Sequence, residues 1–206
     1  MPAVGRPRID AQRRPGKTPR DEILDAAAEL FVTSGFAATS TRRIAEAVGV
    51  RQPALYHYFA SKEDILAELL SGTVVPTLEY AQSLAGTPTE RLHALALYDC
   101  LQLLSGRWNL GRLYHLPELD QPRFAEFIAK RRELFGLYES LSAAVLGDGA
   151  DPRRHLPARL VESVIGMRSD NADVEGIAPV IADSALAVLT YRAPSGRNPR
   201  HIGPAT

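Results

Sequence analysis

The stretch TRRIAEAVGVRQPALYHYFASKEDIL, residues 41–66, decides which fold this sequence can adopt. Ser40 can cap a helix running from about residue 41 to 48, because a serine oxygen accepts from the unpaired N–H groups of a first turn. Gly49 then permits the backbone conformation of a sharp turn. A second short helix is expected over about residues 52–58. Two short helices joined by a tight turn that contains glycine make the helix-turn-helix pattern.

The segment ALYHYF, residues 54–59, crowds aromatic rings into the second of these helices. Leu55 and Phe59 are four residues apart on one helical face, so we expect both to be core residues. Tyr56 points the other way, toward a ligand outside the core. Tyr58 can serve either face. The preceding Pro53 starts this helix and does not break it, because the missing N–H would have no partner in a first turn.

The start of the second helix carries residues suited to reading bases. In a helix-turn-helix this helix enters the major groove with its N-terminal residues toward base edges. The amide of Gln52 can meet adenine in two hydrogen bonds, and Arg51 can pair with guanine or with a phosphate. Pro53 and Ala54 can contact a thymine methyl group.

Residues around the two helices suit phosphate oxygens. The hydroxyls of Ser40 and Thr41 stand at a helix N-terminus, where N–H groups also face an anion. The phenol of Tyr56 beside a basic surface suits a phosphate contact. His57 is either a DNA contact or a solvated surface histidine. Lys62 is either an exposed charge or a phosphate ligand, and the second reading explains why a cation stands where it opposes the helix dipole.

This region resembles the DNA-binding region of the tetracycline-repressor (TetR) family of bacterial regulators over about residues 20–70. The matching residues are Phe31, Gly35, Thr41, Arg42, Ile44, Ala45, Gly49, Val50, Gln52, Pro53, Leu55, Tyr56, Phe59, Ser61, Lys62 and Glu63. The resemblance implies an all-helical homodimer with a C-terminal ligand-binding domain. It also implies roles at the DNA for Thr41, Arg42, Gln52, Tyr56, His57 and Lys62. Arg51 departs from the small hydroxyl residue frequent at its position, which leaves the operator sequence open.

Helical periodicity continues almost to the end of the chain, which predicts an all-α fold. The resemblance implies that this fold consists of an N-terminal three-helix DNA-binding domain and a C-terminal helical ligand-binding and dimerisation domain. Thr18 and Asp21 form a capping box at the first helix, and Ser61 and Asp64 resemble another. The predicted segments are a disordered basic arm at residues 1–18, the helix-turn-helix domain at 19–66, the effector-binding and dimerisation domain at 67–192 and a flexible tail at 193–206. After the helix that begins at Ser61, helices are expected near residues 74–85, 88–105, 107–116, 121–146, 157–168 and 174–191.

Charge is balanced overall but not locally. The 206 residues hold 24 Lys and Arg against 24 Asp and Glu, which argues against a protein that coats nucleic acid along its whole length. Residues 1–20, however, hold six basic side chains and one acidic. Within them Gly5-Arg6-Pro7-Arg8 resembles part of an AT-hook, a minor-groove motif, although Val4 stands where its leading arginine belongs. The alternative is that the arm is only a solubilising, disordered tail. Between these two extremes, nonspecific attraction of the arm to DNA phosphates is the favoured interpretation.

The C-terminal two-thirds can enclose an effector pocket of mostly apolar residues with a few polar groups. The residues proposed for it are Tyr98, Trp108, Asn109, Arg112, His115 and Phe127, with Cys100, Leu104, Leu113, Tyr114, Phe124, Ile128, Phe135 and Tyr138 as further candidates. The alternative for most of them is ordinary core packing. The sequence does not identify the effector.

The last two helices are expected to form the dimer interface, as the resemblance implies. Their apolar faces comprise Leu160, Val164 and Met167 in one helix and Ile177, Ile181, Ala185 and Val188 in the other. A four-helix bundle across a two-fold axis would bury both faces. The alternative is that these faces pack within one subunit.

Catalytic interpretations find little support. The sequence has no G-x-S-x-G elbow, no H-E-x-x-H, no P-loop and no cysteine pair for zinc, so neither a catalytic site nor a metal or cofactor is predicted. With a single cysteine and no long apolar run, we expect a cytoplasmic protein that binds no membrane. The prediction is a ligand-responsive regulator, most consistent with a repressor, that binds a palindromic operator as a dimer and is released by a small molecule. Activation stays open, and the competing class is a small helical enzyme or ligand carrier.

Overall fold

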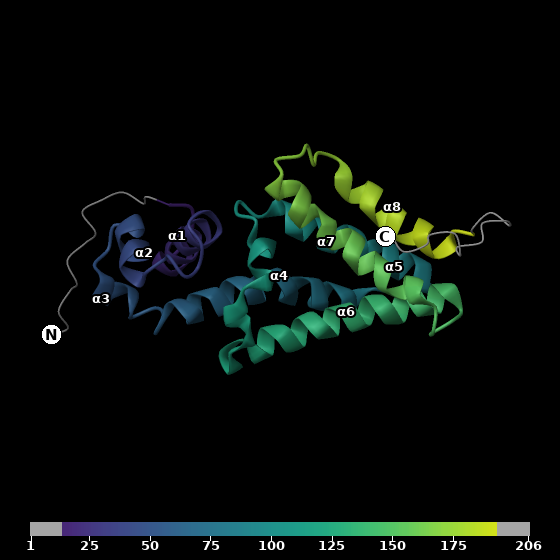
Figure 1. The fold of residues 1–206 in the computed structure, drawn as a ribbon, viewed down its shortest axis with the longest axis horizontal. Helices are drawn as coiled ribbons and strands as arrows, with labels where there is room; N and C mark the ends of the chain where they lie inside the picture. Colours follow the sequence, from purple (N-terminus) through teal and green to yellow (C-terminus); the bar gives the residue numbers. More distant parts are fainter. Residues whose placement is uncertain (1–13, 193–206) are drawn as a thin grey trace, which may run out of the picture.

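The computed structural model describes residues 14–192, and every regular element in that range is a helix, as predicted (Figure 1). The α-helices are α1 (Pro19–Thr33), α2 (Thr41–Val48), α3 (Gln52–Leu55), α4 (Lys62–Ser83), α5 (Pro88–Ser105), α6 (Ala125–Leu146), α7 (Leu156–Ser169) and α8 (Ile177–Thr190). Short 3-10 helices are η1 (Leu110–His115), η2 (Pro117–Asp120), η3 (Pro122–Phe124) and η4 (Pro152–His155). The AT-hook-like segment and the predicted tail lie outside the described residues.

The N-terminal head consists of α1, α2, α3 and the start of α4, and the local signals in its sequence act as expected. The Thr18 side chain accepts from the backbone N–H of Asp21, whose carboxylate accepts in return from the Thr18 N–H, which confirms the capping box. Gly49 ends α2 in the left-handed region at φ 77°, a conformation that favours glycine. Leu55 and Phe59 are buried, so the second short helix is anchored by the two residues predicted for it.

The predicted second helix is shorter than expected but continues as turns. Its α-helical part ends at Leu55, and the N–H groups of Tyr58 and Phe59 both bond to the Leu55 carbonyl, at 2.9 and 3.1 Å. The chain therefore stays coiled through residue 58, as the spacing of Leu55 and Phe59 requires.

A single long helix, α4, joins the head to the rest of the molecule (Figure 1). The sequence predicts one helix that begins at Ser61 and a separate helix near residues 74–85. That prediction is wrong, since α4 runs unbroken over 22 residues with Pro76 inside it. Leu70 and Leu78 stay buried along its inner face, and this burial outweighs the missing N–H of the proline. The predicted domain boundary at residue 66 thus falls within a continuous helix.

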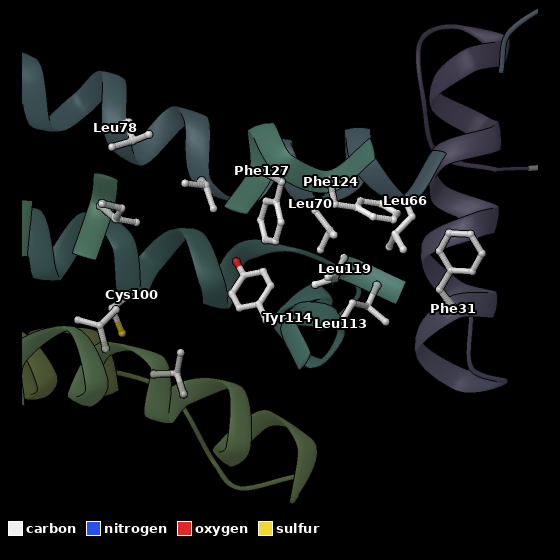
Figure 2. Packing of buried hydrophobic residues seen from close by; sticks show 14 of the residues in the cluster. Phe31, Leu66, Leu70, Leu78, Cys100, Leu113, Tyr114, Leu119, Phe124 and Phe127 are labelled. Carbon is white, nitrogen blue, oxygen red and sulfur yellow. The ribbon is translucent and has the colours of Figure 1, made fainter. Parts of the chain in front are cut away.

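The body is a helical bundle of α4 to α8 in which α5 packs against all four of the others. Its core is continuous with that of the head. Figure 2 shows Phe31 of α1 facing Leu66 and Leu70 of α4, with Leu119 and Phe124 carrying the apolar contact into the body. No helix within residues 14–192 has both the length and the apolar character that crossing a membrane requires.

The predicted helix at 107–116 is instead an irregular loop followed by η1, which packs closely against α7 at Gly111. A Cβ at this position would lie 2.5 Å from Cδ1 of Ile165 on α7, so only glycine lets η1 approach α7 this closely. Downstream, the predicted helix at 121–146 appears as η3 followed by α6. The last helix begins at Ile177, three residues later than predicted.

Candidate nucleic-acid interface and internal cavity

Gln52, proposed to read bases, lies beside Thr41 and Tyr56, which were proposed to contact phosphates. The Gln52 amide nitrogen donates to the Thr41 hydroxyl at 2.8 Å and reaches the Tyr56 hydroxyl at 3.3 Å. The Thr41 and Tyr56 oxygens are themselves 3.2 Å apart. This triangle ties the start of α2 to α3 and places an amide, a hydroxyl and a phenol on one polar surface. Such groups suit base edges and phosphate oxygens.

Most of the other proposed contacts also lie at the surface of the head. Ser40, Arg42, Arg51, Pro53, Tyr56 and His57 are exposed, whereas Thr41, Gln52, Ala54 and Lys62 are half-buried. The Ser40 oxygen accepts from the Arg43 N–H as the cap of α2. Arg42 pairs with Glu46 one turn on, an exposed contact worth little that a phosphate can replace.

Lys62 has partners within the head that the sequence did not suggest. Its ammonium donates to the carbonyls of Phe36 and Thr39, at 2.9 and 3.1 Å, and lies 4.2 Å from the centre of the Phe36 ring. These contacts fasten the loop between α1 and α2 to the start of α4. The cation therefore has a structural reason to stand at this helix start, beside the proposed phosphate contact.

Arg43 and Tyr58 are two further exposed residues of the head. Arg43 is an exposed cation beside the proposed interface that the sequence analysis left out, and its guanidinium donates to the Ala38 carbonyl and the Ser34 hydroxyl. Tyr58, assigned to neither face by the sequence, is exposed and borders a groove that also contains Pro19 and Val50. It lies against α1 rather than in the Gln52 triangle.

A polar bridge connects the head to the body through the loop before η1. The Trp108 indole N–H donates to Asp25 of α1 at 2.9 Å, and Arg107 lies 3.4 Å from the other oxygen of the same carboxylate. Asn109 in turn donates to the Ile165 carbonyl of α7 at 2.8 Å. Trp108 and Asn109 were proposed as effector ligands, but the structure uses both to join α7, this loop and α1.

Arg14 extends the bridge into the helix-turn-helix. Its guanidinium pairs with Asp25 at 3.0 Å and with Glu29 at 2.6 Å, and its Nε donates to the Ala47 carbonyl near the end of α2. The proposed disordered arm was extended to residue 18, yet its described residues, from Arg14 onward, contact the head. A chain of polar contacts thus runs from α7 to the end of α2.

The body encloses a small cavity of about 20 Å³ between α4, α5, α6, α7 and η1. It is lined by Thr73, Val74, Asp99, Leu103, Tyr114, Arg131, Leu134, Phe135, Tyr138, Ala158 and Glu162. None of the six residues proposed as effector ligands is among them. Of the further candidates, Tyr114, Phe135 and Tyr138 do line it, and Phe127 packs behind Tyr114 with ring centres 5.8 Å apart.

The remaining effector candidates lie elsewhere in the body. Tyr98 stacks on Tyr80 with ring centres 4.0 Å apart. Arg112 and His115 are exposed on η1. Within residues 14–192 no group of three or more His, Cys, Asp or Glu side chains is placed to share a metal ion.

Asp99 dominates the chemistry of this cavity, and the sequence analysis missed it. One carboxylate oxygen accepts from the Thr77 hydroxyl at 3.3 Å and the other from the Tyr138 hydroxyl at 3.0 Å. Burial raises the pKa of Asp99 to about 6, against the lowering effect of these two hydrogen bonds. The signal was present, because Asp99 lies one turn from Leu95 and Ala96 on the apolar face of α5.

An ion pair on the outer side of the cavity involves α6 and α7. Arg131 and Arg159 both bond to the carboxylate of Glu162, and both guanidinium groups lie over the Phe135 ring. Arg131 and Phe135 also border an open groove of about 510 Å³, together with Ile128, Arg132, Gly136, Glu139 and Arg159. These two side chains therefore form the wall between the cavity and the groove.

The residues proposed for the dimer interface divide into two sets. Val164, Ile181 and Ala185 are buried within this single chain, so they pack inside the subunit and are not available to a second copy. Leu160, Met167, Ile177 and Val188 are half-buried and remain available. Val180 and Tyr191 of the same region, neither of them proposed from the sequence, are exposed by 55% and 60%.

Comparisons with known proteins agree with this architecture. The family model for bacterial regulatory proteins of the tetR family matches residues 23–69. The crystal structure of Mycobacterium smegmatis AmtR is 55% identical and superposes with a TM-score of 0.83 over 89% of this chain and 92% of that one. The fatty acid metabolism regulator protein of Bacillus subtilis strain 168 is 30% identical over 150 residues, which cover 70% of this chain and 76% of the relative.

Compared with the Bacillus subtilis regulator, the transcriptional repressor KstR2 of Rhodococcus jostii strain RHA1 shows a higher identity over a shorter range. The two chains are 44% identical over 66 residues, covering 32% of this chain and 31% of the relative. The match thus spans about a third of that protein.

Proposed function

This chain belongs to the TetR family of bacterial regulatory proteins and is a DNA-binding transcriptional regulator, and from that premise we propose that it is a repressor that binds a palindromic operator as a dimer and is released by a small molecule. The observation that carries the proposal is the triangle of Thr41, Gln52 and Tyr56 on the exposed side of the helix-turn-helix. The family consists of regulators and not of enzymes. Repression is favoured because KstR2 of Rhodococcus jostii is named a repressor.

At the DNA, Gln52 and Arg51 would contact base edges while Pro53 and Ala54 approach a thymine methyl group. Ser40, Thr41, Arg42, Tyr56, His57 and Lys62 would contact phosphates, which fix the position of the head without reading sequence. Arg43, exposed beside this set, is added to it.

Two heads related by a two-fold axis would reach successive major grooves about 34 Å apart. The outer face of α7 and α8 is proposed to hold the two subunits together, with Leu160, Met167 and Val188 at its edges and Val180 exposed on it. Effector binding in the cavity between α4 and α7 would favour a spacing of the heads that no longer fits the operator, which requires different effector affinities in the two states.

Selection from random duplexes tests the proposal and the role of Gln52 together. The wild-type chain is expected to enrich an inverted repeat with half-site centres about one helical turn apart. Gln52→Ala is expected to enrich the same repeat but to lose discrimination at one base pair per half-site, by about 1–3 kcal/mol. A direct repeat, or a single half-site, would contradict the proposed dimer, and unchanged base preference in the variant would contradict the role of Gln52.

A further inference from the structure

Asp99 is a buried carboxylate without a cation of its own among residues 14–192. Its side chain is 7% exposed, and its two hydrogen bonds come from neutral hydroxyls, those of Thr77 and Tyr138. Arg131, the cation that lines the same cavity, is bonded to Glu162 instead. A buried charge is unfavourable unless it is paired, so a cation bound beside Asp99 would stabilise the ionised carboxylate.

The size and charge of the cavity limit which ligand can pair with Asp99. A volume of about 20 Å³ exceeds the roughly 10–15 Å³ that one water molecule requires and holds one group of that size. Arg131, which lines the cavity, and Arg159 both bond to Glu162, and neither guanidinium group bonds to Asp99. A small monovalent cation fits both limits.

We propose that this cavity binds an ammonium group, either the free ammonium ion or the terminal ammonium group of a small primary amine, and that this cation is the effector. Binding of the amine stands on the cavity alone, whereas its role as effector rests on the proposed function. The cavity therefore selects against apolar acyl chains, which would leave Asp99 unpaired, and against carboxylates, which Asp99 would repel.

The lining supplies hydrogen-bond acceptors for an ammonium group, which donates three hydrogen bonds at the end of a carbon chain and four as the free ion. The Asp99 carboxylate uses two of its roughly four acceptor positions on the hydroxyls. The Tyr114 phenol donates to the Thr73 hydroxyl at 2.8 Å, and the Tyr138 phenol donates to Asp99, so both phenol oxygens keep lone pairs. A carboxylate and two phenol oxygens thus match the three N–H groups.

The outer wall shows where the remainder of a larger amine would go. Phe135 and Arg131 border both the cavity and the open groove of about 510 Å³. An ammonium group at Asp99 would direct its carbon chain between these two side chains into the groove. Thr73, which lines the cavity, and Thr77, which bonds to Asp99, belong to α4, which leads directly to the head. The ammonium site is therefore in contact with the helix that connects the two domains.

Protons compete with the ammonium group for Asp99, because the pKa of this carboxyl group is about 6. Its titratable and charged neighbours are Tyr138 and Arg131 on α6, Glu162 on α7, Tyr114 on η1 and Cys100 beside it on α5, while α4 presents the Thr77 hydroxyl and α8 buries only apolar side chains. Amine affinity should be constant well above pH 6 and fall about tenfold per pH unit below it.

Thermal unfolding of the full chain without DNA tests amine binding. Ammonium chloride and ethylammonium chloride are compared at pH 7.5 with potassium chloride at equal ionic strength, because potassium is a monovalent cation without N–H donors. Asp99→Asn removes the charge at the site, and Asp120→Asn makes the same change at an exposed position on η2. Both amines should raise the melting temperature of the wild type and of Asp120→Asn above the value in potassium chloride, and neither should do so in Asp99→Asn.

The relative size of the two melting-temperature shifts, with ammonium and with ethylammonium, identifies the source of the ammonium group. A larger shift with ammonium assigns the site to the free ion, and a larger shift with ethylammonium assigns it to an amine with a carbon chain. Equal melting temperatures in all three salts, or an amine shift that persists in Asp99→Asn or is undiminished at pH 5, would overturn the proposal. Operator binding is measured separately, so failure of the proposed repressor function would not alter this result.

Discussion

Lys62 has two explanations at the scale of a single residue, and they predict different consequences of its substitution. A phosphate contact contributes about one unit to the salt dependence of DNA binding. The carbonyl contacts with Phe36 and Thr39 instead contribute to the stability of the head.

Lys62→Ala should therefore weaken binding to all DNA sequences equally, lower the salt slope by about one and reduce the melting temperature. Lys62→Gln separates the two roles, because an amide still donates to the carbonyls but carries no charge. Because the amide loses the cation over the Phe36 ring, we expect its melting temperature to lie between those of Lys62→Ala and the wild type, while its salt slope falls. An unchanged slope in both variants, measured by anisotropy of a labelled duplex, would leave Lys62 with the structural role alone.

Asp99 makes the stability of the body depend on pH. Its pKa rises from the ordinary 3.8 to about 6 in the folded protein, so the folded state binds the proton more tightly than the unfolded chain. Stability from this group is fully present below pH 3.8 and is lost as pH rises to about 6, with a total change of about 3 kcal/mol.

Asp99→Asn should remove that dependence. Relative to wild type, the variant should gain stability steadily between pH 4 and pH 6.5 and no further above that, as measured by urea unfolding at each pH. Asp120→Asn serves as the control, because an exposed carboxyl group should leave the pH profile nearly unchanged. A constant difference between wild type and Asp99→Asn across this range would show that burial does not perturb Asp99.

At the scale of elements, the loop of Arg107, Trp108 and Asn109 joins α7 to α1 and provides its own spectroscopic probe. Trp108 is the single tryptophan of the chain, and its indole N–H bonds to Asp25. Asp25→Ala removes an acceptor shared by Trp108, Arg107 and Arg14. A hydrogen bond to a charged group contributes about 1.5–3 kcal/mol, and its loss should expose the indole to water.

We therefore expect Asp25→Ala to shift tryptophan emission to longer wavelength and to lower the free energy of unfolding by about 1–3 kcal/mol. Glu29→Ala is the matched control, since Glu29 also pairs with Arg14 but has no contact with Trp108 among the described interactions. Its emission should equal that of the wild type. The same shift in both variants would mean that Arg14, and not Asp25, positions the loop.

The same elements show which features could be predicted from the sequence and which could not. Caps, turns and apolar spacing are local signals, and they correctly predicted α1, α2 and the burial of Leu55 and Phe59. Gly111 is different, because its role depends on Ile165, 54 positions away in the chain. Trp108 resembled a pocket residue for the same reason: nothing near it in sequence reveals that Asp25 lies beside it.

At the scale of the whole molecule, the two faces of α8 differ in their exposure to solvent. The inner face, with Ile181, Ala182 and Ala185, is buried against the subunit's own core. The outer face exposes Val180, and one exposed valine in a monomer needs no explanation. A second copy of the chain would bury it beside Leu160 and Met167, which are half-buried here.

Val180→Arg should therefore leave the subunit intact and dissociate the dimer. Substitution at a side chain exposed by 55% should change the free energy of unfolding by no more than about 0.5 kcal/mol. Burying the new charge in a two-fold interface costs several kcal/mol, so we expect the dimer dissociation constant to rise at least about a hundredfold, measured by light scattering across a concentration series.

Leu101→Arg is the control, because Leu101 is exposed by 50% but lies on α5. We expect it to remain dimeric and to bind the full operator, whereas Val180→Arg should bind two half-sites no more tightly than one. Loss of the dimer in Leu101→Arg alone would place the two-fold axis on α5. In that case the heads would face a different direction, and the operator spacing of about 34 Å would no longer be expected.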